Sequence, residues 1–311
     1  MKGSEPPVGR LLPEHSHPPT KDLALLSFAV LCGSTAPPLM AALAVPAVAI
    51  AFWRNALALV VVWPTALLRQ RGGFRALTPR VGLAVAFAAA MLGLHFAGMA
   101  TALQYTSVAS AAALVCSQSI WAALFARVLG ERLPPLAWVG TLVALSGVVA
   151  VTGVDLTLSR STLLGNALAV VAGMAGGAYM VTGGVVRRRL GVHVYTAVCY
   201  TMCALMMLAL AVALGQDLWG YSAVAWSQLV ALTVLAQLLG HSLFNFVMRS
   251  VSPSFVSLGQ LFTMPVSALL AAIFLRQAPP LMALPALALM LAGTAVVVLT
   301  QRRRAAVTEG A

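Results

Sequence analysis

Charged residues are scarce in this sequence. Asp, Glu, Lys and Arg together make up 8% of its 311 residues, whereas 61% are hydrophobic. A soluble domain has about 25% charged residues, which cover its water-facing surface. This chain cannot build such a surface, so soluble enzymes, disordered chains and small secreted disulfide scaffolds are all disfavoured. The remaining class is an all-α, polytopic membrane protein.

Recognisable metal and catalytic motifs are also missing. The sequence contains no H-E-x-x-H and no G-x-S-x-G pattern. His241 and Ser242 are adjacent, so on a helix they point about 100° apart and cannot act as base and nucleophile. The four cysteines form no C-x-x-C pair and lie in apolar runs, where we expect them to pack: Cys32, Cys116, Cys199 and Cys203. We therefore expect no metal, no cofactor and no enzymatic activity, with an intramembrane enzyme as the least favoured alternative.

Long apolar runs dominate what is present. A helix needs about 20 apolar residues to cross a bilayer core of about 30 Å. Charged residues, Pro and Gly divide the chain into ten such spans: 23–43, 46–67, 81–103, 107–127, 135–153, 163–185, 193–214, 224–247, 253–275 and 279–300. Residues 1–22 are polar and Pro-rich and are expected to be a disordered cytoplasmic tail. Residues 301–311 are expected to be a basic cytoplasmic tail.

The basic residues lie almost entirely in alternate loops. Sixteen Lys and Arg fall on one side of the predicted membrane, two (Arg160 and Arg276) on the other, and Arg54 lies within the second span. The positive-inside rule then places both termini in the cytoplasm. Because the net charge of +12 is spread over short loops, nucleic-acid binding is disfavoured. The Ala- and Arg-rich composition favours a bacterial inner membrane.

The second half of the chain repeats the first. Two 29-residue stretches, beginning at Ser107 and Ser252, both start with Ser and end with Pro-Pro at an offset of 145 residues. A glycine follows in each last span, at Gly147 and Gly293. We predict two five-span repeats, residues 23–153 and 154–300. Five is an odd number, so the repeats must be inverted, a common plan in transporters.

Three features carry a resemblance to a known family. They are the ten spans in two halves, the sequence FWRN around Arg54 in span two, and the turn from Gly130 to Pro134 between spans four and five. The chain resembles the EamA-type branch of the drug/metabolite transporter superfamily, and within it the bacterial exporters of aromatic and other amino acids (the YddG-like group). The second half departs from this pattern, because Arg276 stands at the position that matches Glu131. The resemblance implies a central cavity lined by spans one, three, four, six, eight and nine.

Polar side chains within the spans are the best indication of a binding site, because they are costly in lipid. In span eight Thr233, Gln237, His241 and Asn245 follow one another at intervals of four, on one helix face. Hydrogen bonds between helices are the alternative explanation, and for His95 the two are equally favoured. The predicted solute-binding residues are His241, Asn245, Gln237, Gln260, Gln118, Tyr179, His95, Trp121 and Met99.

Arg54 and several helix-breaking residues complete the candidates. Arg54 lies about 12 Å inside the membrane by helix rise, and we favour a structural role for it over a role as partner of a substrate anion. Pro37 and Pro38 in span one, and Gly176 and Gly177 in span six, predict breaks at matching places in the two halves. Pro265 predicts a bend in span nine. These five residues are the predicted hinges.

The predicted function is export of small metabolites by alternating access, with aromatic and other neutral amino acids as the expected solutes. All seven acidic residues lie in predicted tails or loops, so no membrane carboxylate is available to exchange a proton for a cationic drug. Movement should therefore be facilitated or weakly coupled. A drug or nucleotide-sugar carrier of the same fold is the alternative. The expected partners are the solute and the lipid bilayer, with no obligate protein partner.

Overall fold

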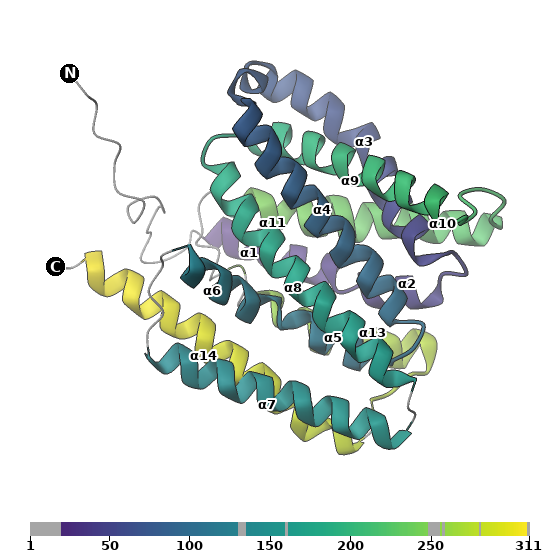
Figure 1. Cartoon of the computed structure of the whole chain (residues 1–311), viewed down its shortest axis with the longest axis vertical. Helices are drawn as coiled ribbons and strands as arrows, with labels where there is room; N and C mark the ends of the chain where they lie inside the picture. Colours follow the sequence, from purple (N-terminus) through teal and green to yellow (C-terminus); the bar gives the residue numbers. More distant parts are fainter. Residues whose placement is uncertain are drawn as a thin grey trace.

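The computed structural model describes residues 20–129, 135–158, 161–247, 256, 259–279 and 281–309, and all regular structure in these ranges is helical (Figure 1). The first half contains α1 (Thr20–Gly33), α2 (Ala36–Ala42), α3 (Ala47–Gln70), η2 (Arg71–Ala76), α4 (Pro79–Ala102), α5 (Val108–Cys116), α6 (Gln118–Val128) and α7 (Pro135–Leu158). The second half contains α8 (Thr162–Arg187), α9 (Val192–Ala213), α10 (Ala223–Leu232), the π-helical turn η3 (Thr233–His241), α11 (Ser242–Val247), α13 (Thr263–Leu275), η4 (Leu281–Ala283) and α14 (Leu284–Glu309). Residues 1–19, the turn 130–134 and most of 248–258 lie outside the described part.

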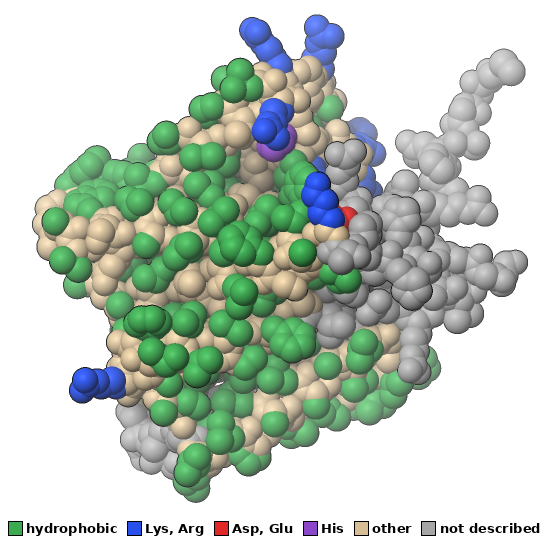
Figure 2. Space-filling model, turned by 180° about the vertical axis from the view of Figure 1, so that it is seen from behind, with side chains coloured by type: hydrophobic (Ala, Val, Ile, Leu, Met, Phe, Trp, Pro, Cys, Tyr) green, Lys and Arg blue, Asp and Glu red, His purple; other side chains and the backbone are tan. Residues whose placement is uncertain are grey.

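These helices correspond to the predicted spans. Seven helical segments are long and apolar enough to cross a membrane, and the other three predicted spans coincide with shorter apolar helices: Pro135–Ala150, Thr263–Leu275 and Leu281–Val296. Figure 2 shows hydrophobic side chains spread over one broad face, with Lys and Arg at its edges. The prediction of a polytopic, all-α membrane protein is confirmed. Two boundaries differ clearly from the prediction. The helix α7 continues to Leu158 and so includes Asp155 in its last turn, and α14 continues to Glu309, through most of the predicted C-terminal tail.

The helix pairings follow the two repeats. If the spans are numbered one to ten, two-fold symmetry relates span one to six, two to seven, three to eight, four to nine and five to ten. Accordingly α3 packs against α9, α5 against α13 and α7 against α14, which are pairs of equivalent spans. The contact between α4 and α8 has its counterpart in the contact between η3 and α1. The core is therefore built by both halves together.

Helix breaks occur in spans one, four and nine. Span one is interrupted between Gly33 and Ala36, as predicted, and the Ser34 carbonyl at this break accepts a 2.8 Å hydrogen bond from Ser267 Oγ of α13. Span four is interrupted at Ser117, between α5 and α6, and span nine at Leu261–Phe262, just before α13. Ser117 and Phe262 are 145 residues apart, the offset of the sequence repeat. The matching breaks are therefore in the fourth span of each half.

The prediction of a break in span six is wrong. The helix α8 runs without interruption from Thr162 to Arg187, through Gly173, Gly176 and Gly177. A Cβ atom at Gly177 would lie 2.7 Å from the Gln118 carbonyl oxygen and 2.8 Å from the Ala122 backbone nitrogen. These glycines allow α6 to approach α8 closely, and close packing is a common use of small residues between membrane helices.

The paired glycines of the last spans give a stability prediction. A Cβ at Gly147 of α7 would lie 2.6 Å from the Met290 backbone nitrogen, and a Cβ at Gly293 of α14 would meet the Ala144 backbone nitrogen. We expect Gly147→Ala to force the two helices apart and to reduce stability by about 1–3 kcal/mol, measured by thermal unfolding in detergent. Gly184→Ala in α8, where no heavy atom lies within 4 Å of the added Cβ, is the matched control. Equal stability of the two variants would contradict the close packing.

Candidate functional site

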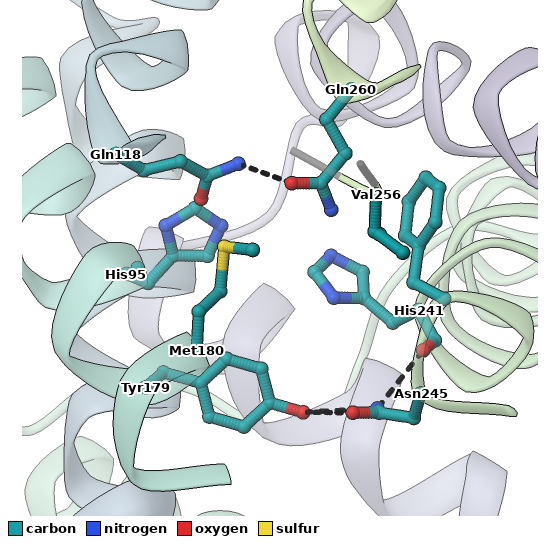
Figure 3. A pocket seen from close by; sticks show the side chains of 10 residues that line it. His95, Gln118, Tyr179, Met180, His241, Asn245, Val256 and Gln260 are labelled. Atoms are coloured by element: carbon teal, nitrogen blue, oxygen red, sulfur yellow. Dashed lines mark hydrogen bonds between the residues drawn. The ribbon is translucent and has the colours of Figure 1, made fainter. Parts of the chain in front are cut away.

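A small cavity, lined by both polar and apolar side chains, lies between the two halves of the bundle. Figure 3 shows side chains of α4, α6 and α8 on one side and of η3, α11 and the segment before α13 on the other. The lining residues are His95, Gln118, Gly176, Tyr179, Met180, His241, Phe244, Asn245, Val256 and Gln260. These belong to spans three, four, six, eight and nine.

Six of the nine predicted solute-binding residues line this cavity: His95, Gln118, Tyr179, His241, Asn245 and Gln260. The other three lie elsewhere. Gln237 is fully buried and bonds to residues of α3, Trp121 Nε1 donates to Ser117 Oγ at 3.2 Å, and Met99 packs in an apolar cluster. In an α-helix, Gln237 and His241, which are four residues apart, would lie on one face. They belong instead to the π-helical turn η3, which has more residues per turn, so this spacing does not predict that both line the cavity.

Two hydrogen-bonded pairs close the sides of the cavity. Gln118 Nε2 donates to Gln260 Oε1 at 3.2 Å, which joins span four to span nine beside their breaks. Asn245 Nδ2 donates to Tyr179 Oη at 3.1 Å and to the His241 carbonyl at 2.9 Å. Each pair keeps further donor or acceptor capacity, since a primary amide has two donors and two lone pairs. The walls can therefore bind a polar solute without a charged side chain.

Two histidines of the cavity lining, His95 and His241, lie edge to face with ring centroids 6.2 Å apart. His95 Nδ1 is 2.9 Å from the Ala172 carbonyl oxygen. A carbonyl can only accept, so Nδ1 carries the proton and Nε2 is left as an acceptor. Within the described part of the chain, neither ring nitrogen of His241 has a hydrogen-bond partner. His241 is thus the polar ring with the most free bonding capacity in the site.

Glycine at position 176 makes this arrangement possible. A Cβ atom there would lie 2.5 Å from Gln118 Oε1 and 2.8 Å from His95 Nδ1. Gly176 was predicted as a hinge and instead forms part of the wall. Sequence reasoning did not select Met180, Phe244 or Val256, because an apolar residue in a membrane span carries no signal that separates lining from packing.

Arg54 lies next to the cavity but does not line it. Its side chain is 1% exposed. Nε donates to Gln237 Oε1 at 3.0 Å, and Gln237 Nε2 donates in turn to Asn55 Oδ1 at 3.1 Å. The guanidinium carbon is 3.5 Å from the centroid of the Phe96 ring, a cation–π contact. A network of neutral groups therefore holds this cation between α3, α4 and η3.

Aromatic side chains close the end of the bundle where α3 begins. Trp53 Nε1 donates to the Leu218 carbonyl at 2.8 Å, which ties α3 to the connection between α9 and α10. The Trp53 ring makes edge contacts with Trp219 and Trp226 at centroid distances of 4.7 and 4.8 Å. We call Trp53, Trp219 and Trp226 the tryptophan cluster. Below it lies an apolar core that includes Met40, Met99 and Leu229.

No three His, Cys, Asp or Glu side chains lie close enough together in the described ranges to hold a metal ion.

Three of the predicted hinge residues are prolines at helix starts. Pro37 and Pro38 lie in the first turn of α2, where a missing backbone N–H costs little, and Pro265 lies in the first turn of α13. Both helices begin directly after a break, so these prolines mark where spans one and nine restart.

A cavity between two repeats of membrane helices, lined by uncharged side chains, is typical of secondary transporters. The family comparison agrees. The EamA-like transporter family matches residues 20–153 and 163–299, and the chain belongs to this family. It is therefore an integral membrane protein of the drug/metabolite transporter superfamily, and membership of a transporter family implies a small-molecule substrate.

Structural comparison supports the fold alone. A protein described only by the words "Crystal structure of protein" superposes with a TM-score of 0.65 at 22% sequence identity, and the match covers 92% of this chain and 99% of that one. No curated protein matches the sequence. The substrate must therefore be inferred from the site.

Proposed function

We propose that this transporter exports small neutral or zwitterionic metabolites, with aromatic and other neutral amino acids as the expected class. The observation that supports this proposal is the chemistry of the cavity wall, which offers hydrogen-bonding groups but no charged side chain. These groups belong to His95, Gln118, Tyr179, Asn245 and Gln260. Met180, Phe244 and Val256 supply an apolar surface in the same cavity. A mixture of this kind suits a solute with a polar head and an apolar side chain.

The position of the cavity between the repeats supports the proposal of alternating access. The tryptophan cluster and the apolar core below it close the end where α3 begins. Tyr179 and Asn245 lie toward the opposite end, near the ends of α8 and α11. We propose that this opposite end faces the cytoplasm, that both termini lie there, and that the membrane is the bacterial inner membrane. The repeats are proposed to comprise residues 23–153 and 154–300.

Movement is proposed to be facilitated or weakly coupled. Asp22 lies in the first turn of α1, Asp155 in the last turn of α7 and Asp217 in the connection before α10. No Asp or Glu is among the described residues that line the cavity, so none of the lining side chains is a carboxylate that could exchange a proton. Collapse of a pH gradient across the vesicle membrane should leave solute movement largely unchanged.

A solute panel in proteoliposomes tests the proposed function. Purified protein is reconstituted, and uptake of radiolabelled amino acids, a cationic drug and a nucleotide sugar is compared with uptake by empty vesicles. We expect saturable uptake of at least one neutral amino acid and none of the cationic drug. Uptake of the drug or the nucleotide sugar alone would replace the proposed substrate class. The mass of the transported compound must be unchanged, because altered product would indicate an enzyme.

A further inference from the structure

Arg54 is a buried cation with an incomplete set of partners. Nε bonds to Gln237 Oε1 at 3.0 Å, and Nη1 lies 3.8 Å from the Met40 sulfur, a weak acceptor. Nη2 is buried and has no hydrogen-bond partner among the described residues. A guanidinium has five N–H donors. Arg54 therefore holds unused donors in a place that water does not reach.

The charge of Arg54 is not neutralised within the described spans. Its neighbours are an amide, a thioether and an aromatic ring, which are all neutral. Burying an unpaired charge carries an effective penalty of several kcal/mol. A carboxylate from outside the chain is the ligand that would offset this penalty, because it can accept two parallel N–H bonds from one guanidinium.

Only one layer of side chains separates Arg54 from the cavity. The Phe96 ring stacks on the guanidinium and also contacts the His241 ring, with centroids 5.1 Å apart. Phe96 follows His95, and Gln237 precedes His241 on the same π-helical turn. Both partners of Arg54 are thus joined to residues that line the cavity. Gln237 and His241 belong to the same element, so a displacement of η3 would move a partner of Arg54 and a lining residue together.

Two helix ends add to the positive potential. The helix α6 begins at Gln118, which lines the cavity, and α13 begins at Thr263, three residues after Gln260. The N-terminus of a helix carries a partial positive charge and favours anions. These ends act in the same direction as Arg54, although neither alone would form a site.

We infer that the transported solute carries a carboxylate and that Arg54 binds it through Nη2 once η3 has moved. This inference rests on the proposed function and narrows its substrate class. His95 and the amides of the cavity wall then remain for the rest of the solute. The π-helical turn is the moving part, in keeping with the frequent occurrence of such turns at functional sites.

Matched pairs of solutes test the inference in the full-length protein. L-Phenylalanine and L-leucine are compared with L-phenylalaninamide and L-leucinamide, in which an amide replaces the carboxylate. Binding is measured as thermal stabilisation of the purified protein in nanodiscs, and transport as uptake into proteoliposomes. A charge-assisted hydrogen bond contributes about 1.5–3 kcal/mol, so we expect each carboxylate to be favoured at least about tenfold over its amide.

Two variants locate this preference at Arg54. Arg54→Lys keeps the charge but loses the planar donor pair and should reduce the preference. Gln237→Glu places an internal carboxylate beside Arg54, keeps a partner for Nε and should abolish the preference in a folded protein. Gln104→Glu makes the same charge change at an exposed position beyond α4 and should behave as wild type.

The outcomes separate the inference from the proposed function. Equal binding of carboxylates and amides, or a preference that persists in Gln237→Glu, would overturn the role of Arg54 while the transporter still moves amino acids. Stabilisation by inorganic phosphate without stabilisation by any carboxylate would overturn the proposed ligand chemistry. If no member of the set binds or is transported, both the inference and the proposed substrate class fail.

Discussion

Replacing Asn245 by alanine is expected to lower the rate of solute uptake by a factor of about 5 to about 150. Asn245 Nδ2 holds both Tyr179 Oη and the His241 carbonyl, at 3.1 and 2.9 Å. Loss of the amide leaves the buried Tyr179 hydroxyl without this donor, and α8 loses a hydrogen bond to α11 at the cavity wall. Leaving a buried polar group unsatisfied costs about 1–3 kcal/mol, and 1.4 kcal/mol corresponds to a factor of ten.

The same measurement applies to His241→Ala, which removes the ring with unused nitrogens. Phe246→Ala is the matched control, because Phe246 lies on α11 beside Asn245 but is 41% exposed on the outer face. Uptake is measured in proteoliposomes, and folding is checked by the elution profile and thermal unfolding in detergent. Unchanged uptake in both Asn245→Ala and His241→Ala would remove these residues from the site.

Tyr179→Phe separates positioning from direct contact. The ring remains and only the hydroxyl is lost, so a double-mutant cycle with Asn245→Ala gives the coupling between the two side chains. If Asn245 acts only through Tyr179, the double variant should be no slower than Asn245→Ala. An additive effect would assign each side chain its own contact with the solute.

The sequence predicted the spans well because hydropathy reports directly on the bilayer. Each of the ten predicted spans coincides with an apolar helix, and the offset of 145 residues relates the break at Ser117 to the break near Phe262. The predicted break in span one is present, whereas the one predicted in span six is not, because α8 is continuous. A glycine in a membrane helix can either interrupt that helix or allow another helix to pack closely against it. The sequence does not distinguish the two roles, and only the close approach of α6 to Gly176 and Gly177 in the structure does so.

The site was predicted in part for a related reason. Polar residues in lipid must face protein or a cavity, and this rule selected His95, Gln118, Tyr179, Asn245 and Gln260 among others. It could not distinguish a residue that faces the cavity from one that binds a neighbour. Gln237 is the clearest case, since its amide oxygen accepts from Arg54 and its amide nitrogen donates to Asn55.

Trp53→Ala is expected to have the largest effect on stability, because it removes the centre of the tryptophan cluster. The Trp53 ring is 8% exposed, contacts Phe52, Trp219 and Trp226, and donates to the Leu218 carbonyl. Truncation of a buried Trp to Ala costs about 3–5 kcal/mol. We expect a correspondingly lower unfolding temperature in detergent, whereas Trp138→Ala should change little, since Trp138 lies on α7 and is 44% exposed.

Trp53→Phe tests the role of the cluster in gating. Phe keeps an aromatic ring but loses the hydrogen bond to Leu218, which contributes about 1 kcal/mol. If the cluster closes one end of the pathway, this change should favour the conformation open at that end. To measure this, a cysteine is introduced in place of Met99, which is buried in the apolar core below the cluster. The rate at which a membrane-impermeant thiol reagent labels this cysteine is then compared between variants. Faster labelling in Trp53→Phe than in the parent Met99→Cys protein is expected, and an equal rate would show that the cluster stabilises the fold without gating it.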